Sequence, residues 1–326
     1  MTVAGILGTG SALPEKIITN FDLEKLVDTS DQWITERTGI KERRQAAPSE
    51  TTSILCIRAA RQALEMAGLK PADLDMIICS TISPDMPLPS TAAFIQRGLG
   101  ARSVLAFDLA AACSGFLFAM TVAEQFIRNG KAKYVLIVGA ELLSRYLDYQ
   151  DRATCVLFGD GVAAGIIGPA TAPSGILATE MHTDGAYAEH LYIPAGGTAR
   201  PASCETVKAR EHYIKMRGNE LFKVAVRSLE EVSRQVLAQA GLRPDQLDLF
   251  IPHQANQRIT DAVRDRLGVS PEKVFSNISR IGNTSSASIP LCLDECVRNG
   301  RVKKGDLVLM SAFGAGVTWG SALIRW

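Results

Sequence analysis

Short, continuous apolar runs alternate along this chain with amphipathic helical patterns. The apolar runs occupy residues 75–81, 103–111, 134–141, 247–253 and 306–313. The helical patterns include residues 58–69 and 115–130. Runs without polar alternation are typical of strands covered on both faces, and strands that alternate with helices indicate parallel pairing through crossover helices. The pattern therefore predicts an α/β protein, and the apolar start of the chain predicts a first buried strand.

The chain also repeats itself at long range. Residues 61–75, RQALEMAGLKPADLD, are echoed at residues 234–248, RQVLAQAGLRPDQLD, so the numbering offset is 173 (234 − 61). The sequence Arg-Asn-Gly that ends at Gly130 returns at Gly300, where the offset is 170 (300 − 130). Two similar offsets across unlike intervening sequence indicate duplication of a half-domain. We therefore predict two related α/β halves, residues 1–170 and residues 171–326.

Two segments of the second half have less regular patterns. Residues 171–211 are rich in proline and glycine and have few echoes in the first half, so they are predicted to form either a long connection between the halves or a surface insertion. Residues 274–278, VFSNI, are predicted to form a short strand that turns into a helix through residues 282–286.

Composition narrows the classes of function. The chain has 326 residues, 47% of them hydrophobic, with 35 basic against 34 acidic side chains. This balance does not indicate a general binder of nucleic acid or of membranes. No apolar stretch reaches the length of a membrane span, and no basic segment precedes the first apolar run. We expect a soluble, cytoplasmic protein.

The seven cysteines contain no Cys-x-x-Cys pair and are expected to be reduced. Cys292 and Cys296 lie four residues apart on a helical pattern, which is a spacing that metal sites can use. Because no histidine lies near them in the sequence, the pair is interpreted as a small-residue packing face, and no metal is predicted.

The carboxyl ends of the predicted strands carry the candidate chemistry, as is usual in open α/β sheets. Cys113 follows the strand at 103–111 and precedes a helix, so its sulfur is expected near the positive end of a helix dipole, which favours the thiolate. Half-ionising a thiol of pKa about 8.5 at neutral pH requires about 2 kcal/mol, and a helix dipole supplies about 0.3–1 kcal/mol. Cys113 is thus either a nucleophile that needs a further hydrogen-bond donor or a small core residue.

Two polar residues lie at comparable places in the second half. His253 ends the strand predicted at 247–253, where it is a candidate functional residue or a satisfied structural histidine. We call the strand-to-helix turn that contains Cys113 an elbow. Asn283 follows Cys113 at the second of the two offsets, 170 (283 − 113), so it is predicted to occupy the duplicate of the Cys113 elbow. One elbow would hold a nucleophile and its twin a neutral hydrogen-bond donor.

These three residues lie in the segments AAACSGF, HQANQRI and GNTSSASIP, which begin at residues 110, 253 and 282. Together the segments resemble the active-site blocks of the β-ketoacyl-ACP synthase III family. The resemblance covers nearly the whole chain, including residues 28–44, 217–226 and 311–326. It implies the thiolase fold, in which two duplicated halves form a five-layered αβαβα sandwich.

The resemblance implies a decarboxylative condensation that initiates fatty-acid synthesis. Cys113 would attack an acyl-CoA primer, acetyl-CoA or a somewhat larger one, and hold the acyl group as a thioester. Malonyl-ACP would then lose carbon dioxide, and His253 and Asn283 would donate hydrogen bonds to the enolate oxygen. The backbone N–H groups of Cys113 and Ala315 would form the oxyanion site. CoA thioester is a substrate here, and no cofactor is implied.

A CoA site is implied by the same resemblance. Its positions correspond to Thr29, Trp33, Arg37, Arg152, Gly218, Phe222, Ala255 and Asn256. Trp33 and Arg152 would enclose the adenine, since an indole and a guanidinium both stack well on a base.

The implied partners are an acidic acyl-carrier protein and a second copy of the chain. The carrier protein would contact Arg258, Lys223 and Arg266, although Asp261 and Asp265 dilute the positive charge of that helix face. The acyl pocket would include Phe158, Phe313 and, from the partner subunit of a homodimer, a residue at position 88. Leu88 stands where an aromatic ring is common in the family, so a primer larger than acetyl is an open alternative.

Several relatives share this scaffold. Degradative thiolases carry a second cysteine in the glycine turn near the carboxyl terminus, but residues 312–316 contain none. Chain-elongating synthases carry a second histidine where Asn283 stands. A condensing or starter enzyme of secondary metabolism remains an open alternative. An inactive scaffold is also an alternative, against which the three intact catalytic positions argue.

Overall fold

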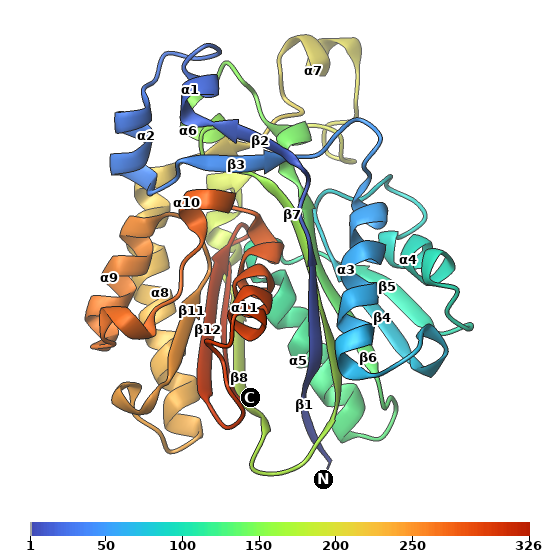
Figure 1. Ribbon diagram of the computed structural model, residues 1–326. Coiled ribbons are helices and arrows are strands. Elements are labelled where there is room, and N and C mark those ends of the chain that lie inside the picture. Colours follow the sequence, from blue (N-terminus) through green and yellow to red (C-terminus); the bar gives the residue numbers. More distant parts are fainter. Residues whose placement is uncertain (1) are drawn as a thin grey trace.

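The computed structural model describes residues 2–326 and contains two large β-sheets (Figure 1). The first sheet has the order β1 (Val3–Ala12), β7 (Asp160–Ala170), β6 (Val135–Leu142), β4 (Met76–Ser80) and β5 (Leu105–Leu109). The second has the order β11 (Leu249–Pro252), β12 (Leu307–Gly314), β13 (Thr318–Arg325) and β8 (Gly175–Thr183). The predicted first strand and the five strands predicted from apolar runs are confirmed.

The sheets are mixed, however, and not parallel throughout as the pattern predicted. β4 is parallel to β5 and β6, and β11 is parallel to β12, whereas the other pairs are antiparallel. β12 and β13 are joined by only residues 315–317. A connection that short permits antiparallel pairing alone, because a parallel crossover needs a dozen or more residues.

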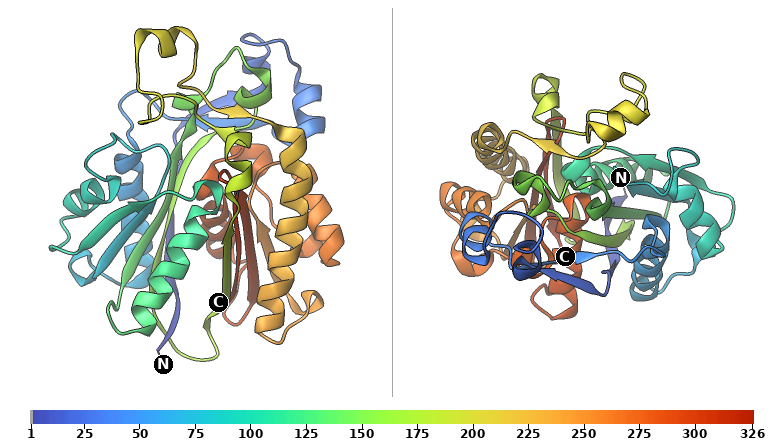
Figure 2. Two further views of the ribbon diagram at one scale, coloured as in Figure 1. Left: turned by 180° about the vertical axis from the view of Figure 1, so that it is seen from behind. Right: turned by 90° about the horizontal axis from the view of Figure 1, so that it is seen from above.

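Helices form three further layers around the two sheets (Figure 2). The middle layer consists of α5 (Gly115–Arg128) and α11 (Ser288–Arg298), each of which contacts strands of both sheets. The outer layers consist of α3 (Thr52–Ala67) and α4 (Thr91–Leu99) on the first sheet, and of α8 (Gly218–Gln239) and α9 (Gln257–Leu267) on the second. This is the five-layered αβαβα arrangement expected of a thiolase fold.

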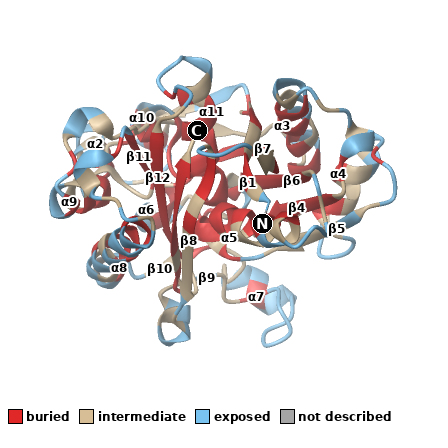
Figure 3. Cartoon of the chain, turned by 90° about the horizontal axis from the view of Figure 1, so that it is seen from below, coloured by how far each residue is buried: buried red, intermediate tan, exposed pale blue. Residues whose placement is uncertain are grey.

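Buried apolar side chains form the clusters between the layers. The buried residues lie in the middle of the molecule and the exposed residues at its periphery (Figure 3). Phe116 of α5 belongs to the central cluster, which also contains Cys292 and Cys296 of α11, both fully buried. These two cysteines therefore pack against apolar neighbours of the central layer. The described residues contain no helix that is both long and apolar enough to cross a membrane.

The predicted division of the chain at residue 170 stays a prediction. In the structure β7 of the first sheet ends at Ala170, and β8 of the second sheet begins at Gly175. β8 lies within the segment 171–211, so the part of that prediction that treated this strand as connection or insertion is wrong. The remainder belongs to an arm after β8 that continues past residue 211 and contains η4 (Gly185–His190), β9 (Leu191–Tyr192), α7 (Cys204–Lys208) and β10 (Lys215–Met216).

The strand predicted at 274–278 is also wrong. Only Val274 pairs with the sheet, through a single parallel bridge to Phe250. A short 3₁₀ turn, η6 (Pro271–Lys273), precedes it, and α10 (Ile278–Ile281) begins four residues later. The Asn277 carbonyl accepts from the N–H groups of Arg280 (3.0 Å) and Ile281 (3.2 Å), so the backbone begins a helical turn there and strand pairing ends.

A small layer covers the end of the molecule that carries the carboxyl ends of β4 and β11 (Figure 1). It contains β2 (Lys16–Thr19), α1 (Asn20–Leu23), α2 (Asp31–Thr38), β3 (Glu42–Gln45) and α6 (Arg152–Cys155). Although α2 and β3 belong to the first half of the sequence, they contact α9 and α10 of the second half. The two halves therefore share this end of the molecule.

Candidate active site

Cys113 lies in a tight turn between β5 and α5. The turn contains η2 (Ala112–Ser114), and Ala112 has a positive φ of 45°. The backbone of β12 passes directly against this turn, because a Cβ at Gly314 would lie 2.7 Å from the Cys113 nitrogen. Cys113 is only 7% exposed. The nucleophile candidate is therefore fixed by close backbone contact between the two halves.

The predicted preference of this elbow for thiolate is not what the structure favours. Burial raises the pKa of the Cys113 thiol to about 12, against the lowering effect of the Ser285 hydroxyl. The Ser285 hydroxyl has one proton and donates it to the Glu141 carboxyl at 3.2 Å, so it does not supply the further donor that a thiolate would require. Because burial dominates the pKa of Cys113, the side chain is a neutral thiol at physiological pH, and deprotonation has to accompany attack on a substrate.

His253 follows the end of β11 and is 2% exposed. Its backbone N–H donates to the Ser311 carbonyl at 2.7 Å, and its ring Nδ1 lies 2.6 Å from the Ser288 Oγ. Burial lowers the pKa of His253 to about 3. The ring is therefore neutral at physiological pH, which suits a hydrogen-bond donor better than a cationic acid.

Asn283 is 5% exposed, and its backbone and side chain are both fixed by hydrogen bonds. Its N–H donates to the Leu157 carbonyl at 2.9 Å, and its carbonyl accepts from the Gly159 N–H at 2.9 Å. The side-chain Oδ1 accepts from the Ser285 N–H at 2.8 Å. Because Oδ1 is occupied in this way, the amide Nδ2 is the group of Asn283 that is left to donate to a ligand.

The prediction that Asn283 duplicates Cys113 is wrong. The two elbows match at their positive-φ residues, Ala112 (φ 45°) and Ser285 (φ 49°), whose numbering offset is 173 (285 − 112). On this alignment the counterpart of Cys113 is Ser286, and Asn283 lies three residues earlier. The offset of 170 applies only to the carboxyl ends of the two central helices, because α5 has 14 residues and α11 has 11.

One chamber contains all three predicted catalytic side chains, and we call it the triad chamber. Its volume is about 80 Å³, and its lining includes Cys113, Phe158, Gly218, Phe222, His253, Ala255, Asn283 and Phe313. Residues from both halves meet there, as the resemblance implied. Phe158 and Phe313, predicted for the acyl pocket, lie in this wall.

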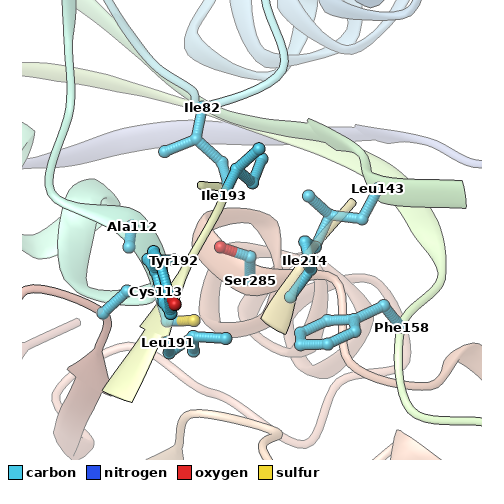
Figure 4. Close-up of a pocket in the computed structure, with 11 residues that line it drawn as sticks. Ile82, Ala112, Cys113, Leu143, Phe158, Leu191, Tyr192, Ile193, Ile214 and Ser285 are labelled. Atoms are coloured by element: carbon cyan, nitrogen blue, oxygen red, sulfur yellow. The ribbon is translucent and has the colours of Figure 1, made fainter. Parts of the chain in front are cut away.

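A second cavity, which we call the apolar cavity, shares Cys113, Phe158 and Leu191 with the triad chamber. Figure 4 shows the residues that line it. Its volume is about 190 Å³, and its lining comprises Ile82, Ala112, Cys113, Leu143, Phe158, Leu191, Tyr192, Ile193, Ile214, Ser285 and Ala315. Of these residues, only Cys113, Phe158 and Ala315 were predicted from the sequence as site residues. Several of the others belong to the arm after β8, whose contact with Cys113 depends on the tertiary fold and leaves no local sequence signal.

A fully buried carboxyl, Glu141 at the end of β6, lies behind the apolar cavity. It accepts hydrogen bonds from the Ser83 hydroxyl (2.8 Å), the Ile82 N–H (3.3 Å) and the Ser285 and Ser286 hydroxyls (3.2 Å each). Burial raises the pKa of Glu141 to about 8, although these hydrogen bonds oppose the shift. Sequence reasoning missed Glu141, whose signal is a lone acid at the end of the apolar run 134–141.

Six of the eight residues predicted to bind CoA fall into two groups. Gly218, Phe222 and Ala255 line the triad chamber. Trp33, Arg37 and Arg152 instead form a surface cluster in which the Arg37 and Arg152 guanidinium carbons lie 5.5 Å and 4.8 Å from the Trp33 ring centroid. Arg152 therefore stacks directly on Trp33, and the space predicted for an adenine between them is closed in this structure.

The other two predicted CoA residues, Asn256 and Thr29, belong to neither group. Asn256 caps the start of α9, because its Oδ1 accepts from the Ile259 N–H at 3.0 Å. The Thr29 hydroxyl is buried without a hydrogen-bond partner among the described residues. A buried hydroxyl without a partner is costly, so Thr29 is the more suggestive of the two as a ligand contact.

The residues predicted to bind a carrier protein are exposed on α8 and α9. The Arg258 guanidinium carbon lies 5.5 Å from the Phe222 ring centroid. Lys223 and Arg266 line a surface groove together with Phe222 and Arg227. Arg266 is also paired with a carboxylate, that of Glu230, at 3.2 Å.

The two aspartates that were predicted to dilute the positive charge of this helix face are paired with a further arginine. Asp261 and Asp265 both pair with Arg264, at 2.9 Å and 2.7 Å.

Leu88, which was predicted to reach the acyl pocket of a partner subunit, does not line either cavity of its own chain and is 83% exposed.

The duplicated five-layered fold, with cysteine, histidine and asparagine converging on one chamber, defines a condensing enzyme of the thiolase superfamily. Comparison with known proteins specifies the family. Models described as 3-oxoacyl-[acyl-carrier-protein (ACP)] synthase III and its C-terminal part match residues 107–185 and 237–326.

Similar proteins support the same assignment over the full length. The chain is 53% identical to the β-ketoacyl-[acyl-carrier-protein] synthase III of Caldanaerobacter subterraneus, over 99% of this chain and 98% of that protein. The crystal structure of 3-oxoacyl-[acyl-carrier-protein] synthase III from Aquifex aeolicus matches with a TM-score of 0.92 at 51% identity, covering 99% and 100% of the two chains. A priming β-ketosynthase from the R1128 polyketide pathway matches with a TM-score of 0.92 at 36% identity, covering 99% and 96%. The chain belongs to the β-ketoacyl-ACP synthase III family of acyl-transferring condensing enzymes.

Proposed function

We propose that this chain condenses an acyl-CoA primer with malonyl-ACP through an acyl-Cys113 intermediate, and so initiates fatty-acid synthesis. The observation that carries the proposal is the triad chamber, in which Cys113, His253 and Asn283 line one cavity. The chemistry needs a nucleophile and two neutral donors, and these three side chains supply them.

In the first half-reaction the Cys113 sulfur attacks the thioester carbonyl of acyl-CoA. The thiol loses its proton as the carbon–sulfur bond forms, and CoA leaves as a thiolate that takes up a proton. The backbone N–H groups of Cys113 and Ala315 would hold the oxyanion of the tetrahedral intermediate, and both residues line the apolar cavity. Exchange of one thioester for another leaves the acyl group activated.

In the second half-reaction the malonyl group loses carbon dioxide, and its electron pair becomes a thioester enolate. His253 and Asn283 donate hydrogen bonds to the enolate oxygen, for which a neutral ring and the unoccupied amide Nδ2 are suited. The enolate carbon attacks the acyl carbonyl on Cys113, and the Cys113 thiolate leaves and regains a proton. No base is needed to remove a proton from carbon.

The apolar cavity supports a primer larger than acetyl. Its volume of about 190 Å³ exceeds the volume of about 150 Å³ at which an apolar protein cavity holds benzene, a six-carbon ligand. Ile214 and Leu143 line its side away from Cys113 (Figure 4). We therefore propose acyl primers of two to about six carbons, with the acyl chain directed from Cys113 toward these two side chains.

The surface of α8 and α9 is the proposed carrier-protein site. Arg258, Lys223 and Arg266 are exposed there, and Phe222 belongs both to the groove and to the triad chamber. A prosthetic arm bound at this groove would therefore enter beside Phe222. Electrostatic attraction of this kind governs association rate and salt dependence more than final affinity.

We further propose a homodimer formed at the outer edge of the first sheet. β5 is the last strand of that sheet, and its Leu105 is 50% exposed. Met86 and Leu88, in the loop after β4, are 45% and 83% exposed. Unpaired strand edges and exposed apolar side chains are both resolved by pairing with another copy, which would carry Leu88 into contact with its partner.

Mass spectrometry of products on the carrier protein tests the function directly. The enzyme is incubated with malonyl-ACP and competing acyl-CoA primers of two to ten carbons, and β-ketoacyl-ACP products are expected up to primers of about six carbons. Replacement of Ile214 by tryptophan should shift the preference toward acetyl-CoA, because it fills the apolar cavity away from Cys113. An acylated Cys113 without any carrier-bound product would instead favour a starter enzyme of secondary metabolism.

A further inference from the structure

Ser288 is the side chain that touches the ring of His253 on the side away from its expected ligand. It is the first residue of α11 and is 1% exposed. Its Oγ lies 2.6 Å from the His253 Nδ1 and accepts a hydrogen bond from the Gln254 N–H at 3.4 Å. The hydroxyl is therefore enclosed between the ring and the backbone that follows it.

These contacts discriminate between the two neutral tautomers of His253. A serine hydroxyl has one proton to donate and can accept two hydrogen bonds. If Nδ1 carried the ring proton, the Ser288 oxygen would accept from both Nδ1 and Gln254, and its own proton would have no acceptor among the described residues. If Nδ1 is unprotonated, the Ser288 hydroxyl donates to it and every group is satisfied.

The position of Ser288 also disfavours the charged form of the ring. It begins a helix of 11 residues, so the His253 ring lies beside the positive end of the α11 dipole. Burial acts in the same direction and lowers the pKa of His253. Both effects disfavour an imidazolium, which would carry a proton on each ring nitrogen.

We propose that Ser288 is a positioning residue that holds His253 in the tautomer with its proton on Nε2. The Ser288 hydroxyl donates to Nδ1, so the remaining N–H of the ring is directed into the triad chamber. With the proton on Nδ1 instead, Nε2 would present a lone pair to the enolate oxygen and oppose its formation. The catalytic meaning of Ser288 rests on the proposed function, whereas the tautomer itself does not.

Nitrogen-15 NMR of the histidine side chains in the wild-type enzyme tests the tautomer without any substitution, and the His253→Ala spectrum assigns the signal. We expect His253 to be neutral and protonated on Nε2 at pH 7. A ring protonated on Nδ1 would overturn the proposal, even if the enzyme were fully active.

Replacement of Ser288 by alanine tests the consequence for catalysis. The two half-reactions are measured separately, as acylation of Cys113 by labelled acyl-CoA and as decarboxylation of malonyl-ACP without a primer. Loss of a buried hydrogen bond costs about 1–3 kcal/mol, so decarboxylation is expected to fall about 5- to 150-fold while acylation changes little. The retained acylation also demonstrates that the variant is folded.

Ser286→Ala is the matched control. Ser286 lies in the same turn and is also 1% exposed, but its hydrogen bonds go to Ser80, Ala140 and Glu141 and not to His253. It should affect the two half-reactions by the same factor. Equal losses in Ser288→Ala, or unchanged decarboxylation, would reduce Ser288 to a structural residue. Absence of decarboxylation in the wild-type enzyme would contradict the proposed function and leave the NMR result on the tautomer intact.

Discussion

The elbow before α5 and the elbow before α11 have nearly the same backbone and opposite uses. Each contains a positive-φ residue, a short 3₁₀ turn and the start of a central helix. Cys113 in the first elbow lines two cavities, whereas its counterpart Ser286 lies close to the Ser80 carbonyl (3.1 Å) and the Glu141 carboxyl (3.2 Å). The second elbow thus forms hydrogen bonds that join the two halves, whereas the first elbow presents its side chain to the cavities.

The parallel strands that precede the active-site residues are also related by the duplication. Met76 pairs with Val135 in the first sheet, and Leu249 pairs with Val308 in the second, so the strands are again related by an offset of 173 (249 − 76 and 308 − 135). On this alignment the counterpart of His253 is a serine, Ser80. The duplication therefore produced two comparable arrangements, of which one has reactive side chains with a cavity and the other has small hydroxyls packed without one.

Exchange of the two elbow residues should have the largest effect on acyl transfer. Cys113→Ser, which gives the first elbow the residue type of the second, should lower acyl transfer by at least about 10⁴-fold. The reverse change, Ser286→Cys, should introduce a thiol that acyl-CoA does not label, because Ser286 is 1% exposed. Intact-protein mass spectrometry after incubation with acyl-CoA measures both. An acyl adduct on Cys113→Ser at wild-type rate, or on the thiol introduced by Ser286→Cys, would contradict the assignment.

Removal of either donor should separate the two half-reactions. His253→Ala and Asn283→Ala should each lower malonyl-ACP decarboxylation about 10²- to 10³-fold, the usual effect of losing one donor to a developing oxyanion. Acylation of Cys113 should be nearly unchanged, because neither side chain is assigned to the first tetrahedral intermediate. Single-turnover acylation and decarboxylation assays distinguish the steps, and equal losses in both would refute the division of roles.

Each elbow packs closely against one glycine, Gly314 at the first elbow and Gly139 at the second. A Cβ at Gly314 would approach the Cys113 nitrogen to 2.7 Å, and a Cβ at Gly139 would overlap the Ser286 carbonyl oxygen. Both changes overpack the interior, at about 1–3 kcal/mol. Gly314→Ala should lower acyl transfer by more than its loss of stability explains, whereas Gly139→Ala should act mainly on the melting temperature. Acylation rates and thermal unfolding of both variants test this, and the reverse ranking would contradict it.

Glu141 allows the smallest and most specific test, because both Ser285 and Ser286 of the second elbow donate to its carboxyl. Burial raises the pKa of Glu141 to about 8 from its ordinary value of 4.5, so the folded state holds this proton more tightly than the unfolded state. The stability that results is fully present below pH 4.5 and is lost as the pH rises toward 8.

Glu141→Gln cannot lose this proton. The melting temperature of the variant relative to the wild type should therefore increase by a few degrees between pH 5 and pH 8. Thermal unfolding at matched ionic strength measures the difference, and a constant difference across that range would show that Glu141 does not titrate there.

The sequence identified the buried strands, the duplication and the three catalytic candidates because each leaves a local pattern. Apolar runs marked β4, β6, β11 and β12, and Cys113 and His253 followed strand ends. The pairing of Asn283 with Cys113 was wrong because α5 is three residues longer than α11, a difference that only the aligned turns reveal. The residue type was predicted correctly while its place in the duplication was not.

Contacts that depend on tertiary packing left no such pattern. Nothing in the spacing between residues 253 and 288 tells which hydroxyl of the second elbow meets the histidine ring. Likewise, Leu191 and Ile193 reach the apolar cavity only because the arm after β8 folds back over Cys113. The predicted strand at 274–278 failed because the Asn277 carbonyl accepts from the N–H groups of Arg280 and Ile281 and so begins a helical turn.

The junction of the two cavities at Cys113 has a kinetic consequence. Gly218, Phe222 and Ala255, which the resemblance predicts to contact CoA, line the same chamber as His253 and Asn283, so CoA and the malonyl thioester are expected to occupy overlapping space. CoA must then depart before the second substrate enters, while the acyl chain waits in the other cavity. We expect double-displacement kinetics, with parallel lines in double-reciprocal plots and inhibition of primer loading by excess malonyl-ACP.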